Sequence, residues 1–167
     1  MEAKDIIKNL EGSKEFKEWK KERKDSFLAH IFKMFDEANA GETQAGYYNK
    51  DDTITTFLIA GDGVKLMQSE EIFKKPDAKV LKLELKNIKV DIGKALKTAD
   101  EIQQKEFKAH TPIKKILILQ KLEVLGQVYN ITFVTQSFNI LNLKIDSGTG
   151  KISEKLFKPI MDFRTNG

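Results

Sequence analysis

Residues 141–153, LNLKIDSGTGKIS, hold Gly148, Gly150 and Lys151 beside Asp146 and Thr149, residue types that can bind phosphate or a metal ion. A nucleotide-binding loop needs G-x-x-x-x-G-K-[ST] between a strand and a helix. Here Ile145 stands where the first glycine is required, five residues before Gly150, and Ile152 stands where a hydroxyl is required. A calcium loop would need oxygen-bearing side chains at alternate positions and a glutamate at position twelve, which the segment lacks. We therefore expect neither a nucleotide site nor a calcium site here.

The same residues fit a tight turn between two strands. The Asp146 carboxylate can accept hydrogen bonds from backbone amides two residues further on. Gly150 can adopt the left-handed backbone conformation that brings the chain into the next strand. The segment therefore predicts a hairpin turn and no catalytic loop.

Histidine and cysteine provide no catalytic or metal-binding pattern. The chain has no cysteine, which excludes thiol nucleophiles, thiolate metal sites and disulfides. His30 is expected on the solvent face of a helix, and His110 at the end of another helix, where a cation suits the helix dipole. Neither belongs to an H-x-H or H-E-x-x-H pair. We expect no metal site.

Serine and carboxylate chemistry is equally unsupported. No G-x-S-x-G motif, which places a nucleophilic serine in one family of hydrolases, occurs in the sequence. Acid–base catalysis would have to use aspartates of predicted turns, which usually stabilise the turn itself: Asp51, Asp52, Asp62 and Asp146. We therefore predict no catalytic residues, no cofactor and no enzyme. An enzyme with a carboxylate or tyrosine site in an internal cleft is the least favoured alternative.

The charge pattern argues against a dedicated nucleic-acid protein. The formal net charge is +4, but of the 29 basic residues only Arg23 and Arg164 are arginine, which reads phosphate and guanine better than lysine does. The lysines are spread along the chain and interleaved with Glu and Asp. We expect a solvated surface of mixed charge, and weak nucleic-acid binding through lysines and exposed aromatic residues remains the alternative.

The sequence predicts no membrane segment. Residues 124–143 contain no charge and are long enough to span a bilayer, but five amides recur through them, each of which would be costly in lipid. Two strands joined by a turn explain this stretch better. The charged N-terminal residues contain no apolar stretch of a secretory signal, so we expect a cytoplasmic location.

The first half of the chain predicts helix and then strands. Apolar residues recur at three- and four-residue spacing over residues 4–38, with Ser13 as the N-cap of a second helix and residues 39–41 as its end. Residues 45–67 have the β-branched and aromatic composition of strands, broken by turn residues at 49–52 and 61–63. Residues 79–91 alternate apolar and charged side chains, which predicts a further strand.

The second half repeats this order. Asp91 is the expected N-cap of a helix that Thr111 and Pro112 end. Strands are predicted over residues 113–124, 128–135, 138–146 and 151–157.

A short sequence match accompanies this doubling. Residues 69–76 and 153–159 share S-E-x-[IL]-F-K-P, with one inserted lysine. The predicted fold is therefore α+β, with two α-β-β-β units, each a helix plus an antiparallel sheet, related by duplication. We place an N-terminal helical segment at residues 1–25 and the units at residues 26–90 and 91–167, which could form one compact domain.

The turn at residues 143–152, LKIDSGTGKI, resembles the closing hairpin of PepSY-type domains. The resemblance covers residues 91–156 and, more weakly, residues 26–73. It implies a cystatin-like fold, in which a helix packs across a curved antiparallel sheet. It also implies a non-catalytic module, here similar to the stand-alone uncharacterised versions found in prokaryotes, including archaea.

These observations together favour a binding or regulatory module that recognises a protein, a peptide or a small ligand. Most aromatic side chains are expected in the core, whereas tyrosines suit a partly open groove because their hydroxyls need a polar partner. Exposed sheet edges could pair two copies into a homodimer. The candidate groove residues are Tyr47, Tyr48, Phe57, Tyr129 and Phe133.

Overall fold

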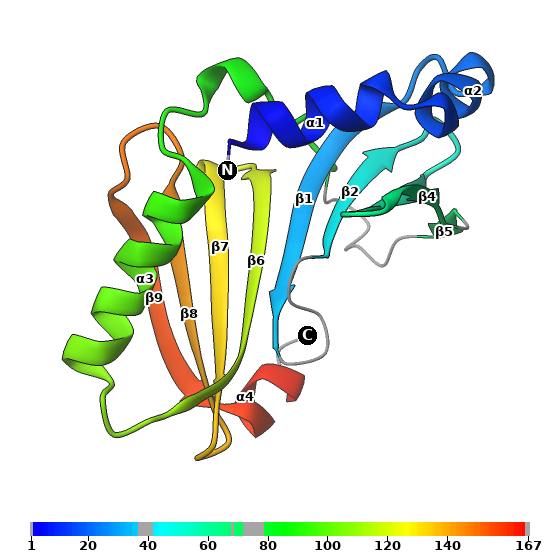
Figure 1. Cartoon of the computed structure of the whole chain (residues 1–167). Helices are drawn as coiled ribbons and strands as arrows, with labels where there is room; N and C mark the ends of the chain where they lie inside the picture. Colours follow the sequence, from blue (N-terminus) through cyan, green and yellow to red (C-terminus); the bar gives the residue numbers. More distant parts are fainter. Residues whose placement is uncertain (1, 37–41, 68, 72–78, 166–167) are drawn as a thin grey trace.

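The computed structural model describes residues 2–36, 42–67, 69–71 and 79–165. Helices lie at the start, middle and end of the chain, and the described strands form one antiparallel sheet (Figure 1). The elements are α1 (Ala3–Gly12), α2 (Lys14–Glu22), β1 (Phe27–Phe35), β2 (Thr43–Tyr48), β3 (Thr53–Ala60), β4 (Gly63–Leu66), β5 (Glu70–Glu71), a 3₁₀ turn (Leu85–Asn87), α3 (Ile92–Glu106), β6 (Pro112–Leu122), β7 (Gly126–Thr135), β8 (Asn139–Asp146), β9 (Ile152–Pro159) and α4 (Ile160–Thr165).

The sheet consists of two meanders that meet in the middle. Its strand order is β4-β3-β2-β1-β6-β7-β8-β9, with β5 also pairing with β3. Each meander follows helical residues in the chain: α1 and α2 precede β1, and α3 precedes β6. The fold is therefore α+β with two helix-plus-strands halves, an arrangement consistent with duplication. Each half has a meander of four strands, one more than the α-β-β-β unit proposed as the repeat.

One face of the sheet packs against the helices and forms the core. Ile31 pairs with Ala45 on β2 and with Leu119 on β6, and Leu119 in turn pairs with Tyr129 on β7. All four side chains are fully buried. They belong to the same apolar cluster as Ile7 and other residues of α1, and as Ala95 and Ala99 of α3. The core is therefore shared by both halves.

The expected helix over residues 4–38 is wrong in its last part, because residues 27–35 form β1. This strand lies between β2 and β6, and all of its residues are buried or half-buried, so apolar side chains occur on both of its faces. Apolar side chains on both faces remove the two-residue alternation and imitate helical spacing. The expected helix end at residues 39–41 lies outside the described residues.

The strand expected over residues 79–91 is also wrong, because the segment is irregular apart from its 3₁₀ turn. It packs across the sheet, and its backbone bonds to scattered partners: the Leu83 amide donates to the Leu28 carbonyl at 2.9 Å. The Gln127 side chain donates to the Glu84 carbonyl at 3.1 Å. Leu83 is almost fully buried, so the alternation reflects packing of one side of the segment.

Several local predictions are confirmed. Ser13 caps α2, its hydroxyl accepting from the Phe16 amide at 3.2 Å, and Asp91 caps α3, accepting from the Lys94 amide at 2.7 Å. The repeated motif at residues 69–76 lies mostly outside the described residues. Among the described residues, no helix has the length and apolar character needed to cross a lipid bilayer.

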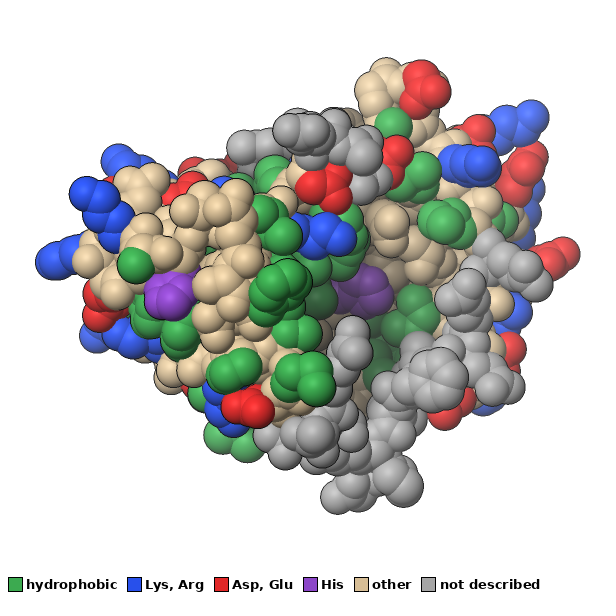
Figure 2. All heavy atoms as spheres, turned by 90° about the horizontal axis from the view of Figure 1, so that it is seen from below, with side chains coloured by type: hydrophobic (Ala, Val, Ile, Leu, Met, Phe, Trp, Pro, Cys, Tyr) green, Lys and Arg blue, Asp and Glu red, His purple; other side chains and the backbone are tan. Residues whose placement is uncertain are grey.

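Viewed from below, hydrophobic side chains gather toward the middle of the molecule, and charged side chains are most frequent toward its two ends (Figure 2).

Candidate functional site

The turn at residues 146–150 has the predicted geometry. The Asp146 carboxylate accepts hydrogen bonds from the amides of Gly148 and Thr149, both at 2.8 Å. Gly150 is left-handed with φ of +79°. The amides that a phosphate would need are thus bonded to Asp146, which makes the segment a structural turn.

The two histidines occupy structural positions. His30 lies on β1 with its ring against Gly46, and it is half-buried, so its expected place on an exposed helix face is wrong. Burial lowers the pKa of His30 below its usual value. The His110 ring lies 2.8 Å from the Ser137 hydroxyl and packs on Phe157, with centroids 4.7 Å apart. Across the residues that the structure describes, no three His, Asp or Glu side chains converge as metal ligands.

The five aromatic candidates do not line a single groove. Tyr47 borders a cavity, and the fully buried Phe57 packs edge-on against it, with centroids 5.8 Å apart. Tyr48, the next residue along β2, points to the opposite face of the sheet, where its hydroxyl donates to Asp52.

The other two candidates belong to the second half of the core. Tyr129 is fully buried, and its hydroxyl donates to the Val90 carbonyl. Phe133 is also buried, with the Lys115 ammonium 5.8 Å from its ring centroid. Their aromatic rings therefore stabilise the fold.

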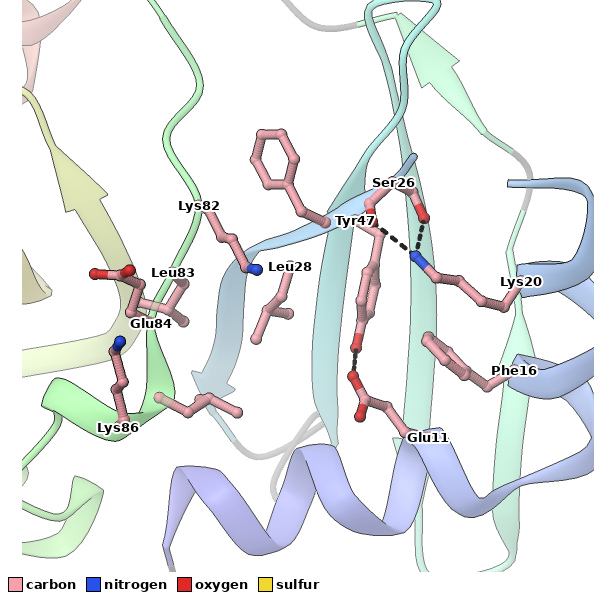
Figure 3. Close-up of a pocket in the computed structure, with 12 residues that line it drawn as sticks. Glu11, Phe16, Lys20, Ser26, Leu28, Tyr47, Lys82, Leu83, Glu84 and Lys86 are labelled. Carbon is pink, nitrogen blue, oxygen red and sulfur yellow. Dashed lines mark hydrogen bonds between the residues drawn. The ribbon is translucent and has the colours of Figure 1, made fainter. Parts of the chain in front are cut away.

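A cavity of about 540 Å³ opens between the N-terminal helices, the start of β1 and the irregular segment that precedes α3 (Figure 3). Ligand pockets in proteins span about 300–1,000 Å³. The lining residues come from three separate parts of the chain: Glu11, Phe16, Lys20, Ser26, Phe27, Leu28, Tyr47, Lys82, Leu83, Glu84, Leu85 and Lys86.

An aromatic cluster supports one wall of this cavity. Phe16 of α2 packs on Tyr47 with centroids 5.1 Å apart, and Trp19 packs on both, at 5.4 Å from each. Phe16 and Tyr47 are buried, so the wall is fixed by packing. Trp19, the single tryptophan of the chain, lies directly behind the wall.

A hydrogen bond ties this wall to α1. The Tyr47 hydroxyl donates to a Glu11 carboxylate oxygen at 3.2 Å. Burial, with a smaller effect of the Glu11 charge, raises the pKa of Tyr47 well above its usual range. Tyr47 therefore stays a neutral donor at physiological pH and cannot act as a general base there.

Lys20 and Ser26 form the closest approach to a catalytic pair in the cavity. The Lys20 ammonium donates to the Ser26 carbonyl at 2.7 Å and to its hydroxyl at 3.0 Å. A serine–lysine dyad needs the lysine to accept the hydroxyl proton. Here the Ser26 hydroxyl donates instead to the Arg23 carbonyl at 2.6 Å, so the lysine positions the chain and the serine is not activated.

Sequence reasoning found Tyr47 and missed the rest of the cavity. The sequence contained one indication of the cavity wall at residues 82–86. Their pattern, K-L-E-L-K, places apolar and charged side chains on different sides of the segment. That pattern was interpreted as a strand. Nothing local indicated that this segment would line a cavity together with residues of α2.

Comparisons with known proteins define a fold class and no particular protein. No family model matches the sequence, and no curated protein matches it. The fold is similar to that in the crystal structure of a putative lipoprotein from Clostridium difficile 630, with a TM-score of 0.56. The match covers 86% of this chain and 90% of that chain at 17% sequence identity, so it shows the fold alone. The molecule belongs to this class of α+β proteins, with helices covering an antiparallel sheet.

Proposed function

We propose that the protein is a non-catalytic binding module whose ligand site is the cavity beside Tyr47. The cavity carries this proposal, because it combines a buried apolar floor with charged groups at its rim, the usual composition of a ligand pocket. The turn at residues 143–152 resembles that of PepSY-type domains, which are non-catalytic, and this resemblance supports a module without catalysis. We propose that the two halves are a tandem pair of PepSY-like units.

The surface charges support this reading over nucleic-acid binding. Several lysines are paired with carboxylates, such as Lys115 with Asp100 and Lys144 with Glu154, both at 2.9 Å. A lysine that is already paired with a carboxylate neutralises a phosphate less effectively than an unpaired lysine. Fewer counterions are then released from the nucleic acid, and binding is weaker. A steeply salt-dependent mobility shift with DNA or RNA would favour the alternative.

The first experiment is a titration of the protein with a library of small amphiphilic molecules and short peptides, followed by Trp19 fluorescence. Because Trp19 packs against Phe16 and Tyr47 at the wall, we expect a ligand in the cavity to change its emission. Isothermal calorimetry then gives the affinity of each hit.

A blocked variant and a matched control locate the binding. Leu85→Phe adds volume inside the cavity and should lower the affinity for each hit by at least about tenfold. This corresponds to about 1.4 kcal/mol of binding free energy. Leu122→Phe, at the end of β6 and outside the cavity, should leave affinity unchanged. Hits that bind both variants equally well, or no hit at all, would contradict the proposed site.

We propose a cytoplasmic location as the working assignment. The similar structure is described as that of a putative lipoprotein, which supplies the competing assignment to a membrane surface. Fractionation of host cells followed by immunoblotting separates the two, and recovery in the membrane fraction would overturn the cytoplasmic assignment.

A further inference from the structure

We infer that the cavity selects an amphiphilic anion: an alkyl chain that carries one terminal carboxylate. This inference rests on the proposed function and names the chemical class of its ligand.

The floor of the cavity is apolar and preformed. Leu28 is 6% exposed and Leu83 is 2% exposed, and both are fixed by the hydrogen bond between their backbones. Phe16 closes the side against α2. Phe27 and Leu85 are half-buried and leave apolar surface at the opening. An alkyl chain placed on this floor would remove apolar surface from water on both partners.

The rim carries cations whose charge is not neutralised inside the cavity. Lys20 donates to the uncharged oxygens of Ser26, and Lys82 is exposed without a carboxylate partner among the described residues. Figure 3 shows Lys20 and Lys82 extending toward each other from opposite sides of the cavity.

Each of the two lining glutamates already has a partner of its own. The Glu11 carboxylate accepts from the Tyr47 hydroxyl, beside α1. The Glu84 carboxylate points away from the space between the lysines and lies 3.6 Å from Lys121, outside the cavity. The position between Lys20 and Lys82 therefore complements an anionic head group, and charge-assisted hydrogen bonds would fix it there.

Three ligands of equal chain length test the charge preference: decanoate, decanol and decylamine, each below the concentration at which it forms micelles. Affinities are measured by calorimetry and Trp19 fluorescence at low ionic strength. We expect decanoate to bind about tenfold more tightly than decanol, because a charge-assisted hydrogen bond contributes more than a neutral one. Decylamine should bind most weakly.

Charge-removing variants assign the head group. Lys82→Gln should weaken decanoate by about tenfold and leave decanol within about twofold, because only the anion uses the ammonium group. Lys20→Gln provides a second, independent variant. Lys97→Gln, which removes an exposed charge on α3, is the matched control and should change neither affinity.

The outcomes separate the two proposals. Equal affinity for decanoate and decanol would overturn the selection of an anion and leave the cavity as a binding site. Hits from the library with no decanoate binding would likewise overturn this inference alone. The absence of binding by the alkyl ligands and by the whole library would overturn both.

Discussion

At the scale of single residues, Gly46 lets the side chain of a neighbouring strand pack against its backbone. It faces His30 across the β1–β2 pair. A methyl group added at Gly46 would lie 2.2 Å from Cε1 and 2.5 Å from Nε2 of the His30 ring. The imidazole therefore occupies the space that any other residue at position 46 would need.

We predict that Gly46→Ala destabilises the protein by about 1–3 kcal/mol, because the ring must move out of a packed position. His30→Ala removes the obstacle, so the double variant should lose much less than the sum of the two single changes. Urea unfolding followed by circular dichroism measures all three. Gly12→Ala, at the end of α1 with open space around it, is the control and should not destabilise. Additive losses would contradict the steric explanation.

Residue-level predictions were accurate where the chemistry is local. Ser13, Asp91 and Asp146 bond to amides within three residues, so the sequence alone contains both partners. The place of His30 depends instead on which strand lies beside it, and that information is spread over the chain.

At the scale of elements, the same distinction holds. Hairpins at residues 49–52 and 61–63 were predicted from turn residues and are present between β2, β3 and β4. The strand β1 was predicted as helix because a central strand can be apolar on both faces. Residues 79–91, before α3, were predicted as a strand. A segment that buries one of its sides has the same alternation of apolar and charged side chains as a strand paired in a sheet.

The β8–β9 turn allows a direct test of what a turn aspartate contributes. We predict that Asp146→Ala destabilises by about 1–2 kcal/mol, because two backbone amides lose their acceptor. Asp146→Asn should recover part of the loss, since an amide oxygen can accept the same bonds. Thermal and urea unfolding provide the measurement.

The matched control lies in the β3–β4 turn. Asp62 is exposed and has no hydrogen-bond partner within the described part of the chain, so Asp62→Ala should change stability by no more than about 0.5 kcal/mol. An equal loss for Asp62→Ala and Asp146→Ala would show that the carboxylate contact is not the cause.

At the scale of the whole molecule, the two meanders are joined by the β1–β6 pair. Six residue pairs from His30–Gln120 to Phe35–Lys115 connect them, and one apolar cluster includes residues of both halves. The doubling of helix and strands was predicted from the sequence. The cavity was not, because its walls come from three separate parts of the chain, residues 11–28, Tyr47 and residues 82–86, and no local pattern encodes their proximity.

Because the β1–β6 pair, here called the seam, joins the two halves, we predict that both halves unfold together. Trp19 reports on the first half, whereas far-ultraviolet circular dichroism reports on all helices and strands, so the two urea transitions should coincide.

Leu117→Ala removes a fully buried side chain from β6 at the seam and should cost about 2–5 kcal/mol. Both signals should shift equally, because the halves share one core. Ile113→Ala, on the same strand but 56% exposed, should shift neither appreciably. If the Trp19 transition separated from the dichroism signal, the halves would be independent units, and the cavity could then open without unfolding the second meander.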